Sequence, residues 1–458
     1  MIKQNTVLFT LFLNVFFITS LFAPNKAFSF ADVQTKTLES GAEIWVIEDK
    51  TVPVISVDFA FKGGIVNDPI DKLGLANFTS KMMTQGAGDL SASEFQKQLD
   101  DLSISMSFSA GRDHFYGSLK TLRSNQDEAF ELLRLSLLSP TFNEDDIERV
   151  REHIMASLKQ SQAEPTWQMW RNFNKTYYEG YPYSKPSAGT LETLKFIKQD
   201  DFLGFVKDRF KFDQLKIVFA GDITLEEATA IVNETFGDLR MTVAEKPSLD
   251  EFDDEVKKQT VKVELDIPQT FILMGRPISI DEKSDQWGAA LVANYLIGGG
   301  SFSSKLMENV RSQEGLSYGI SSSLLTQKHA DLFIIQTSTA FENLEKMRST
   351  IVDTLNQVIH EDFSQEEIDR AKSYLIGSLP VSLTSTDKLS SAYLSLLVDG
   401  LEPDFFDKRA KQIEAVSPSD VSVAIASILG DFSFLSVEVG KQPKVEEPKK
   451  DAKKDKKK

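Results

Sequence analysis

Residues 74–88 read GLANFTSKMMTQGAG, and the fold is organised around this segment. We predict a helix from about Leu73 to Thr84 that ends at Gly86. Two segments that alternate apolar and polar residues precede it, as paired strands do. Downstream, Ser91 and Glu94 have the spacing of a capping box that begins another helix. The segment therefore joins a pair of strands to a layer of helices.

The same order of elements occurs twice along the chain. In the first half we predict strands at Glu43–Glu48, Pro53–Lys62, Ile104–Ala110, His114–Leu119 and Lys216–Ala220. In the second half we predict strands at Val261–Leu265, Thr270–Pro277, Leu316–Leu325, Asp331–Thr337 and Phe434–Val439. Helices lie between them in both halves, among them Gln199–Arg209 and Leu344–Ile359. This repetition predicts a duplicated α+β fold, in which each of two homologous domains packs a mixed sheet against helices.

The ends of the chain differ in composition from the rest. Residues 1–31 combine Lys3, an apolar run and small residues in the order of a secretory signal peptide, which predicts a periplasmic or secreted protein. We place one domain at residues 32–241 and the other at 260–440, with the acidic segment 242–259 as their linker. Residues 441–458 are rich in lysine and predicted to be disordered.

Charge and cysteine content exclude several classes of function. The net charge is −17 over 458 residues, and both ends of the chain are net basic, so the folded body is more acidic still. Nucleic-acid binding needs a basic surface and is excluded on this ground. The chain has no cysteine, which excludes disulfides and thiolate metal sites and is compatible with a bacterial periplasm.

Several motifs resemble the pitrilysin or insulinase-like family of zinc metallopeptidases, or inverzincins, in its two-domain bacterial form. The matching segments are KGGIVNDP at 62–69, GLA at 74–76, GGGSFSSKL at 298–306 and the R-x-x-x-G-L-x-Y pattern from Arg311 to Tyr318. The resemblance covers almost the whole chain after residue 31. It implies two homologous domains in a half-clamshell arrangement.

The residues that bind zinc in that family are replaced here. Catalytic members carry an H-x-x-E-H motif, in which two histidines bind zinc and a glutamate activates water. Asn77, Ser80 and Lys81 occupy these positions, and local alignment places a third ligand, a glutamate, near Ser157. None of the four is a suitable metal ligand or general base. We therefore predict that this chain binds no metal and that zinc is held by a partner subunit.

A second set of family residues is present. In members built from two unlike subunits, one subunit holds zinc and the other supplies an Arg/Tyr pair, here Arg311 and Tyr318. An arginine fork binds a carbonyl or carboxylate, and a phenol donates to an oxygen that becomes negative in the transition state. The resemblance also implies that Gly298, Gly299 and Gly300 form a flexible segment that a peptide approaches closely. The loop lacks the glycine before lysine that a phosphate-binding loop needs.

These expectations lead to one function and two alternatives. The chain is expected to be a non-catalytic, substrate-binding subunit of a periplasmic zinc metallopeptidase heterodimer, inactive alone, acting on peptide or unfolded polypeptide. The first alternative is an inactive homologue that serves as a scaffold or binds peptides. The second is an enzyme with relocated metal ligands, which the scattered histidines disfavour: His114, His153, His329 and His360.

Overall fold

Two sheets of the same topology form the centre of the molecule. The computed structural model describes residues 30–242, 252, 255 and 257–441. The six strands of the first sheet, in spatial order, are β1 (Val33–Thr37), β2 (Glu43–Glu48), β6 (Lys216–Gly221), β3 (Val54–Lys62), β5 (His114–Leu122) and β4 (Ser105–Ala110). The five strands of the second are β7 (Gln259–Glu264), β11 (Leu435–Gly440), β8 (Gln269–Pro277), β10 (Leu332–Ala340) and β9 (Ile320–Leu325).

The strand order confirms the predicted duplication. The order β2-β6-β3-β5-β4 in the first sheet corresponds to β7-β11-β8-β10-β9 in the second, and β1 is an additional edge strand. In both sheets the first and last strands of the repeat run parallel, and the other neighbours are antiparallel. The chain therefore has the predicted α+β fold with two mixed sheets.

Helices lie between the strands in both halves, but the last helix of the first half follows its closing strand, whereas the last helix of the second half precedes its closing strand. The first half contains α2 (Leu75–Met82), α3 (Ala92–Asp101), α4 (Gln126–Leu138), α5 (Glu144–Ala163), α6 (Pro165–Tyr177), α7 (Gln199–Arg209) and α8 (Leu225–Phe236). The second contains α9 (Trp287–Asn294), α10 (Lys305–Met307), α11 (Leu344–Ile359), α12 (Gln365–Ser382), α13 (Thr386–Asp399), α14 (Phe405–Ala415) and α15 (Pro418–Leu429). The capping box predicted at Ser91 is present, and Ser364 forms another at the start of α12.

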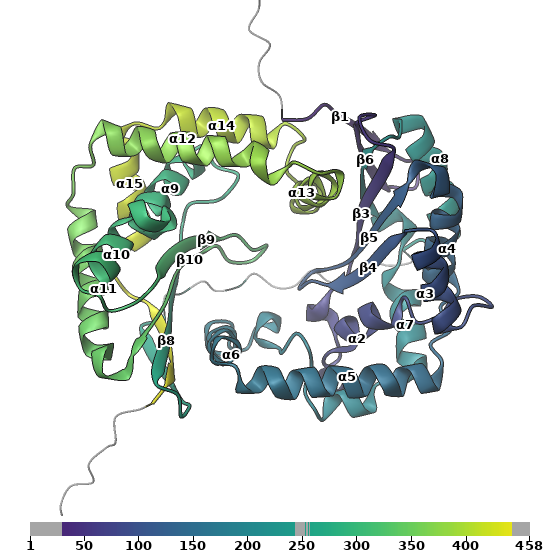
Figure 1. The fold of residues 1–458 in the computed structure, drawn as a ribbon, viewed down its shortest axis with the longest axis horizontal. Helices are drawn as coiled ribbons and strands as arrows, with labels where there is room; N and C mark the ends of the chain where they lie inside the picture. The colour runs from purple at the N-terminus through teal and green to yellow at the C-terminus, as the bar shows by residue number, and fades with distance from the viewer. Residues whose placement is uncertain (1–29, 243–251, 253–254, 256, 442–458) are drawn as a thin grey trace, which may run out of the picture.

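Each half places one helix on the sheet of the other half. Helix α6 packs on β11 and β8, and the corresponding helix α13 packs on β6 and β3 (Figure 1). The ring of Phe173 on α6 lies against Gly275 on β8, where any side chain would collide with it. Tyr393 and Leu397 on α13 join the apolar cluster around Trp45 and Val218 of the first sheet. The exchange of helices fixes the two halves to each other.

Two differences from the sequence prediction concern strands. Strand β1 was not predicted. The predicted strand Leu316–Leu325 begins only at Ile320, so Tyr318 precedes it. The reason is that Thr337 and Thr339 of the neighbouring strand β10 donate side-chain hydrogen bonds to the carbonyls of Gly319 and Leu316, at 2.9 and 2.7 Å. These bonds replace the backbone ladder there.

Parts of three predicted segments fall outside the described residues. They are residues 1–29 of the predicted signal peptide, most of the linker, and the tail after Lys441. Of the linker, Phe252 packs among the rings of Tyr177, Tyr178 and Tyr181. In the described part of the chain, no helix has both the length and the apolar character needed to cross a bilayer.

Candidate functional site

Helix α2 is held at its start by a buried ion pair. Asp68 is fully buried at its side chain, and its carboxylate accepts hydrogen bonds from the backbone N–H groups of Gly74 and Ala76, each at 3.2 Å. Arg209 on α7 contacts the same carboxylate at 3.2 Å. Burial raises the pKa of Asp68, and the Arg209 guanidinium opposes this shift. Gly74 has φ of 94°, a left-handed conformation that favours glycine.

The four residues at the family's metal positions line one cavity. Asn77, Ser80 and Lys81 reach it from α2, and Ser157 reaches it from α5. The cavity has a volume of about 760 Å³. Alignment in the sequence therefore identified positions that the fold brings together.

The side chains at the family's metal positions do not suit a metal ion. The Ser80 hydroxyl donates to the carbonyl of Asn77 at 2.7 Å, and Lys81 places an ammonium where the family has an imidazole. Among the described residues, no group of three or more His, Asp or Glu side chains is arranged to bind a metal. Zinc binding and the activation of water by a metal have no basis in these residues.

Arg311 and Tyr318 lie on the surface of the second half. Arg311 is in a π-helical turn, η10 (Glu308–Gln313), and its guanidinium lies 4.6 Å from the centroid of the Phe302 ring. Tyr318 is 89% exposed and Phe302 is 68% exposed. Neither Arg311 nor Tyr318 lines the cavity at α2. The structure thus leaves this pair and the former metal positions as two separate features.

The glycines from Gly298 to Gly300 lie in and after a second π-helical turn, η8 (Tyr295–Gly299). A Cβ on Gly298 would lie 2.6 Å from the Ser322 hydroxyl, and one on Gly300 would lie 2.7 Å from the Tyr295 carbonyl oxygen. The close approaches that these two glycines permit are therefore to the chain itself. A contact between this segment and a peptide stays a prediction.

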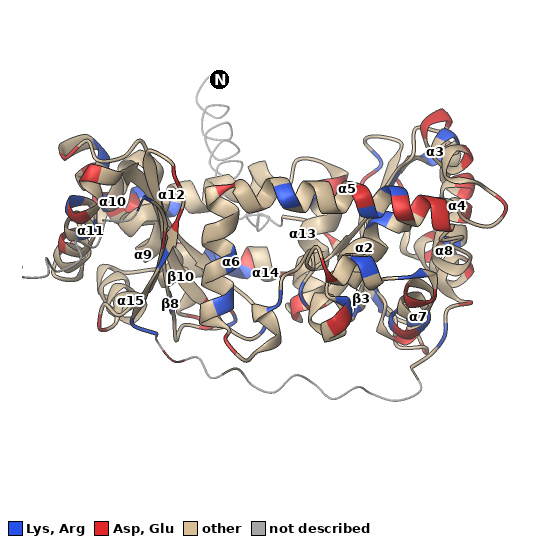
Figure 2. Ribbon diagram, turned by 90° about the horizontal axis from the view of Figure 1, so that it is seen from below, with Lys and Arg blue, Asp and Glu red and all other residues tan. Residues whose placement is uncertain are grey.

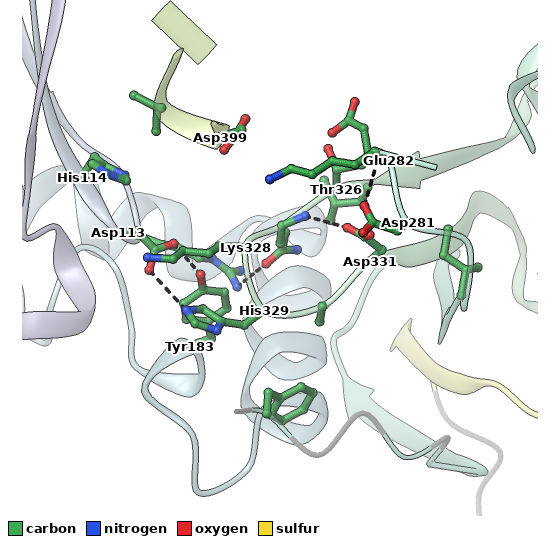
Figure 3. A pocket seen from close by; sticks show the side chains of 18 of the residues that line it. Asp113, His114, Tyr183, Asp281, Glu282, Thr326, Lys328, His329, Asp331 and Asp399 are labelled. Carbon is green, nitrogen blue, oxygen red and sulfur yellow. Dashed lines mark hydrogen bonds and ion pairs between the residues drawn. The ribbon is translucent and has the colours of Figure 1, made fainter. Parts of the chain in front are cut away.

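A larger cavity lies between the two halves, and the sequence analysis did not identify it. Its volume is about 940 Å³, and Figure 3 shows side chains of both halves around it. The hairpin between β4 and β5 contributes Asp113 and His114, and the hairpin between β9 and β10 contributes Lys328 and His329. Two histidines that are far apart in sequence thus line one cavity.

Hydrogen bonds across this cavity connect the halves. Arg112 donates to Gln327 at 2.8 Å and to Asn174 at 3.0 Å, and its guanidinium lies over the rings of Tyr178 and Tyr183. Tyr183 also donates to Asp113. These contacts join the β4–β5 hairpin and α6 of the first half to the β9–β10 hairpin of the second.

Burial shifts the pKa values of two side chains in this central cavity. Burial lowers the pKa of His114 to about 4, although Asp113 opposes the shift. Burial and the hydrogen bond to Asp113 raise the pKa of Tyr183. His114 is therefore neutral near pH 7. The duplicated topology was the available signal for this cavity, because the β4–β5 and β9–β10 hairpins are equivalent in the two repeats and both line it.

Known proteins with similar sequences belong to one peptidase family. Residues 44–191 match the model of the insulinase family, peptidase family M16, and residues 197–375 match the model of the peptidase M16 inactive domain. A relative from Helicobacter pylori, described as the non-peptidase homolog YmxG, is 25% identical over 401 residues, covering 87% of this chain and 92% of its own.

Solved structures have the same fold. The peptidase M16 inactive domain from Pseudomonas fluorescens superimposes with a TM-score of 0.83 at 22% identity, covering 90% of this chain and 99% of its own. The periplasmic protease PqqL from Escherichia coli gives a TM-score of 0.76 at 14% identity, covering 92% of this chain but only 48% of its own. The chain belongs to peptidase family M16, the insulinase family, and lacks the zinc-binding motif of the family's catalytic members.

Proposed function

We propose that this chain is the non-catalytic, substrate-binding subunit of a zinc metallopeptidase formed with a homologous partner that holds the zinc. The observation that carries the proposal is the cavity at α2, where Asn77, Ser80, Lys81 and Ser157 all meet and none can bind a metal. Four substitutions at one place remove the catalytic function as a unit while the surrounding fold is kept.

The exposed pair in the second half supports a role beside a partner. Tyr318 and Phe302 are large aromatic side chains that a lone chain leaves in water, with Arg311 packed on one of them. Tyrosine and arginine are frequent among residues that dominate binding at interfaces. In the assembly, Arg311 would bind a peptide carbonyl and Tyr318 would donate a hydrogen bond to the oxygen that becomes negative.

The proposed enzyme is a heterodimer of homologous chains. This chain matches 48% of the periplasmic protease PqqL in fold, and we infer that the partner supplies the other part of the enclosed peptide site. We place the assembly in the periplasm, because residues 1–31 have the order of a signal peptide. The substrate would be a peptide or unfolded polypeptide, and Gly298, Gly299 and Gly300 would lie near it.

The test is a pair of substitutions in the reconstituted heterodimer. Tyr318→Phe removes one hydrogen-bond donor, and we expect kcat to fall about 100-fold, as when one oxyanion donor is lost. Arg311→Ala should raise KM and lower kcat/KM. The controls are Tyr374→Phe and Arg370→Ala, which alter exposed side chains of the same types on α12. Size-exclusion chromatography should show unchanged assembly for all four variants.

The alternative function is a scaffold or peptide-binding homologue without any part in hydrolysis. The similarity to a protein described as a non-peptidase homolog favours it. In that case Tyr318→Phe and Arg311→Ala would leave turnover of any partner at the level of the controls. That result would replace the proposed function with the scaffold function.

A further inference from the structure

The cavity at α2 has a chemical character of its own. Its lining contains a lysine, an arginine and a histidine, namely Lys81, Arg149 and His153, and no aspartate or glutamate among the described residues. This is unusual in a chain with a net charge of −17. Figure 2 shows acidic residues on α3, on α8 and on α5; of these helices only α5 supplies residues to the cavity, and none of its acidic residues is among them. The lining of the cavity is thus basic, although acidic residues of α5 lie close to it.

The polar residues of one wall come from a single face of α5. Arg149, His153, Ser157 and Ser161 all line the cavity, and each is four residues from the next. Side chains at this spacing lie one above the other along a helix. The Arg149 guanidinium is positioned by Gln85, at 2.7 Å, and by Asp146, at 2.6 Å. The face therefore offers an ordered row of hydrogen-bond donors.

Lys81 is the cation available to a ligand. It is exposed in the last turn of α2 and forms no ion pair with any residue that the structure describes. Arg149, in contrast, is paired with Asp146. The Lys81 ammonium occupies the position where catalytic relatives have a zinc-binding histidine. A fixed positive charge thus stands where those relatives place a metal cation.

Another part of the lining, here called the apolar wall, is hydrophobic. It consists of side chains from β4, α5 and α6, namely Met106, Phe108, Val150, Ile154, Leu158 and Trp167. A ligand that combines an anionic group with an apolar body would match both the basic and the apolar parts of this lining. A volume of about 760 Å³ is within the usual range for small-ligand sites.

We propose that this cavity binds the C-terminal carboxylate of a peptide whose last side chain is apolar. Lys81 pairs with the carboxylate, hydroxyl groups of α5 complete its hydrogen bonds, and the terminal side chain contacts the apolar wall. The cation attracts the carboxylate as a metal would, but it activates no water. This inference rests on the proposed function in one respect, which is that the ligand is a peptide.

The experiment compares two forms of one peptide by calorimetric titration of the full chain. N-acetyl-Ala-Ala-Phe with a free carboxylate should bind at least tenfold more tightly than the same peptide with a C-terminal amide, since only the acid forms a charge-assisted hydrogen bond. Lys81→Met should reduce the affinity for the acid to that for the amide. Lys159→Met is the matched control, because Lys159 is an exposed lysine on α5 that does not line the cavity.

Several outcomes would overturn the inference. Equal affinity of the wild-type chain for acid and amide would do so, as would a preference for the acid that survives Lys81→Met in a variant with a native circular dichroism spectrum. Tighter binding of dodecanoate than of the peptide acid would show that the site takes aliphatic carboxylates. EDTA should change none of the affinities, and EDTA sensitivity would show that a metal binds the carboxylate.

The result of the peptide titration can be distinguished from the result of the test of the proposed function. If the wild-type chain binds the acid and the amide equally but still forms an active, Tyr318-dependent complex, the carboxylate site is refuted and the proposed function is not. A chain that prefers the acid but forms no complex with a zinc-bearing homologue supports the carboxylate site and refutes the proposed heterodimer.

Discussion

Asp58 provides the sharpest prediction, because it lies where α13 of the second half packs on β3 of the first. Its carboxylate accepts a hydrogen bond from Ser390 of α13. Burial raises its pKa from 3.8 to about 6, although the Ser390 hydrogen bond opposes the shift. The folded protein therefore holds a proton on Asp58 between about pH 4 and pH 6, whereas the unfolded chain does not.

The sign and size of the effect follow from this difference. A carboxyl group with a raised pKa in the folded state contributes stability at low pH, and this contribution is lost as pH rises through the folded pKa. Each pKa unit corresponds to about 1.4 kcal/mol, so the loss is about 3 kcal/mol. Asp58→Asn removes the titration and keeps an oxygen that accepts the Ser390 hydrogen bond. The variant and the wild type should be similarly stable near pH 3.5, and the variant should be about 3 kcal/mol more stable at pH 7.5.

Urea unfolding followed by circular dichroism at a series of pH values measures this difference. Comparing the two proteins at each pH cancels the other titrating groups. A difference in free energy of unfolding that stays constant from pH 3.5 to pH 7.5 would refute the reasoning. A variant that is less stable than the wild type at pH 7.5 would refute it as well.

Three further predictions concern the central cavity, the former metal site and the glycine segment. His114, whose pKa burial lowers to about 4, contributes stability above pH 6.5 that is lost as pH falls. As the pH is lowered from 7.5 to 4, the free energy of unfolding of His114→Gln should therefore rise by about 3 kcal/mol relative to that of the wild type. A difference in urea unfolding that stays constant over this pH range would contradict this. The triple variant Asn77→His, Ser80→Glu and Lys81→His should still bind zinc weakly. Adding Ser157→Glu to it should give about one zinc per chain by elemental analysis. If both variants lack zinc equally, Ser157 is not the position of the third ligand. Gly298→Ala should lower the free energy of unfolding by about 1–3 kcal/mol, because the added Cβ would collide with Ser322. Gly377→Ala is the control and should not destabilise the protein, because there is open space around Gly377. Equal effects of the two substitutions would exclude packing as the reason for glycine at position 298.

Much of the fold was predictable because its signals are local. The bounds of α7 and α11 agree with the sequence prediction, Gln199–Arg209 and Leu344–Ile359. The predicted capping box at Ser91 begins α3. Hydrogen-bonding side chains and apolar periods act within a few residues, so a single segment contains the information.

The exchange of helices was not predictable from such signals. An apolar stripe on α6 or α13 shows that one face is buried, but it does not show which sheet covers that face. The position of Tyr318 outside strand β9 depends on hydrogen bonds from Thr337 and Thr339, which a strand pattern does not reveal. Both features arise from contacts between segments that are distant in sequence.

In the candidate sites too, some features were predictable from the sequence and others appear only in the folded structure. Alignment with a known motif located Asn77, Ser80, Lys81 and Ser157, and the fold gathers them at one cavity. The apolar wall and the row of donors on α5 appear only when α5, β4 and α6 are assembled. His114 and His329 are 215 residues apart in the sequence and meet only through the pairing of two hairpins.

Hydrolysis of an unstructured polypeptide by the chain purified alone, with and without EDTA, tests the central claim most directly. Because Asn77, Ser80, Lys81 and Ser157 supply neither a set of metal ligands nor a general base, the lone chain should release no peptide above the buffer control, in either condition. Hydrolysis by the lone chain that EDTA abolishes would contradict the account, since it would show that this polypeptide holds a catalytic metal itself.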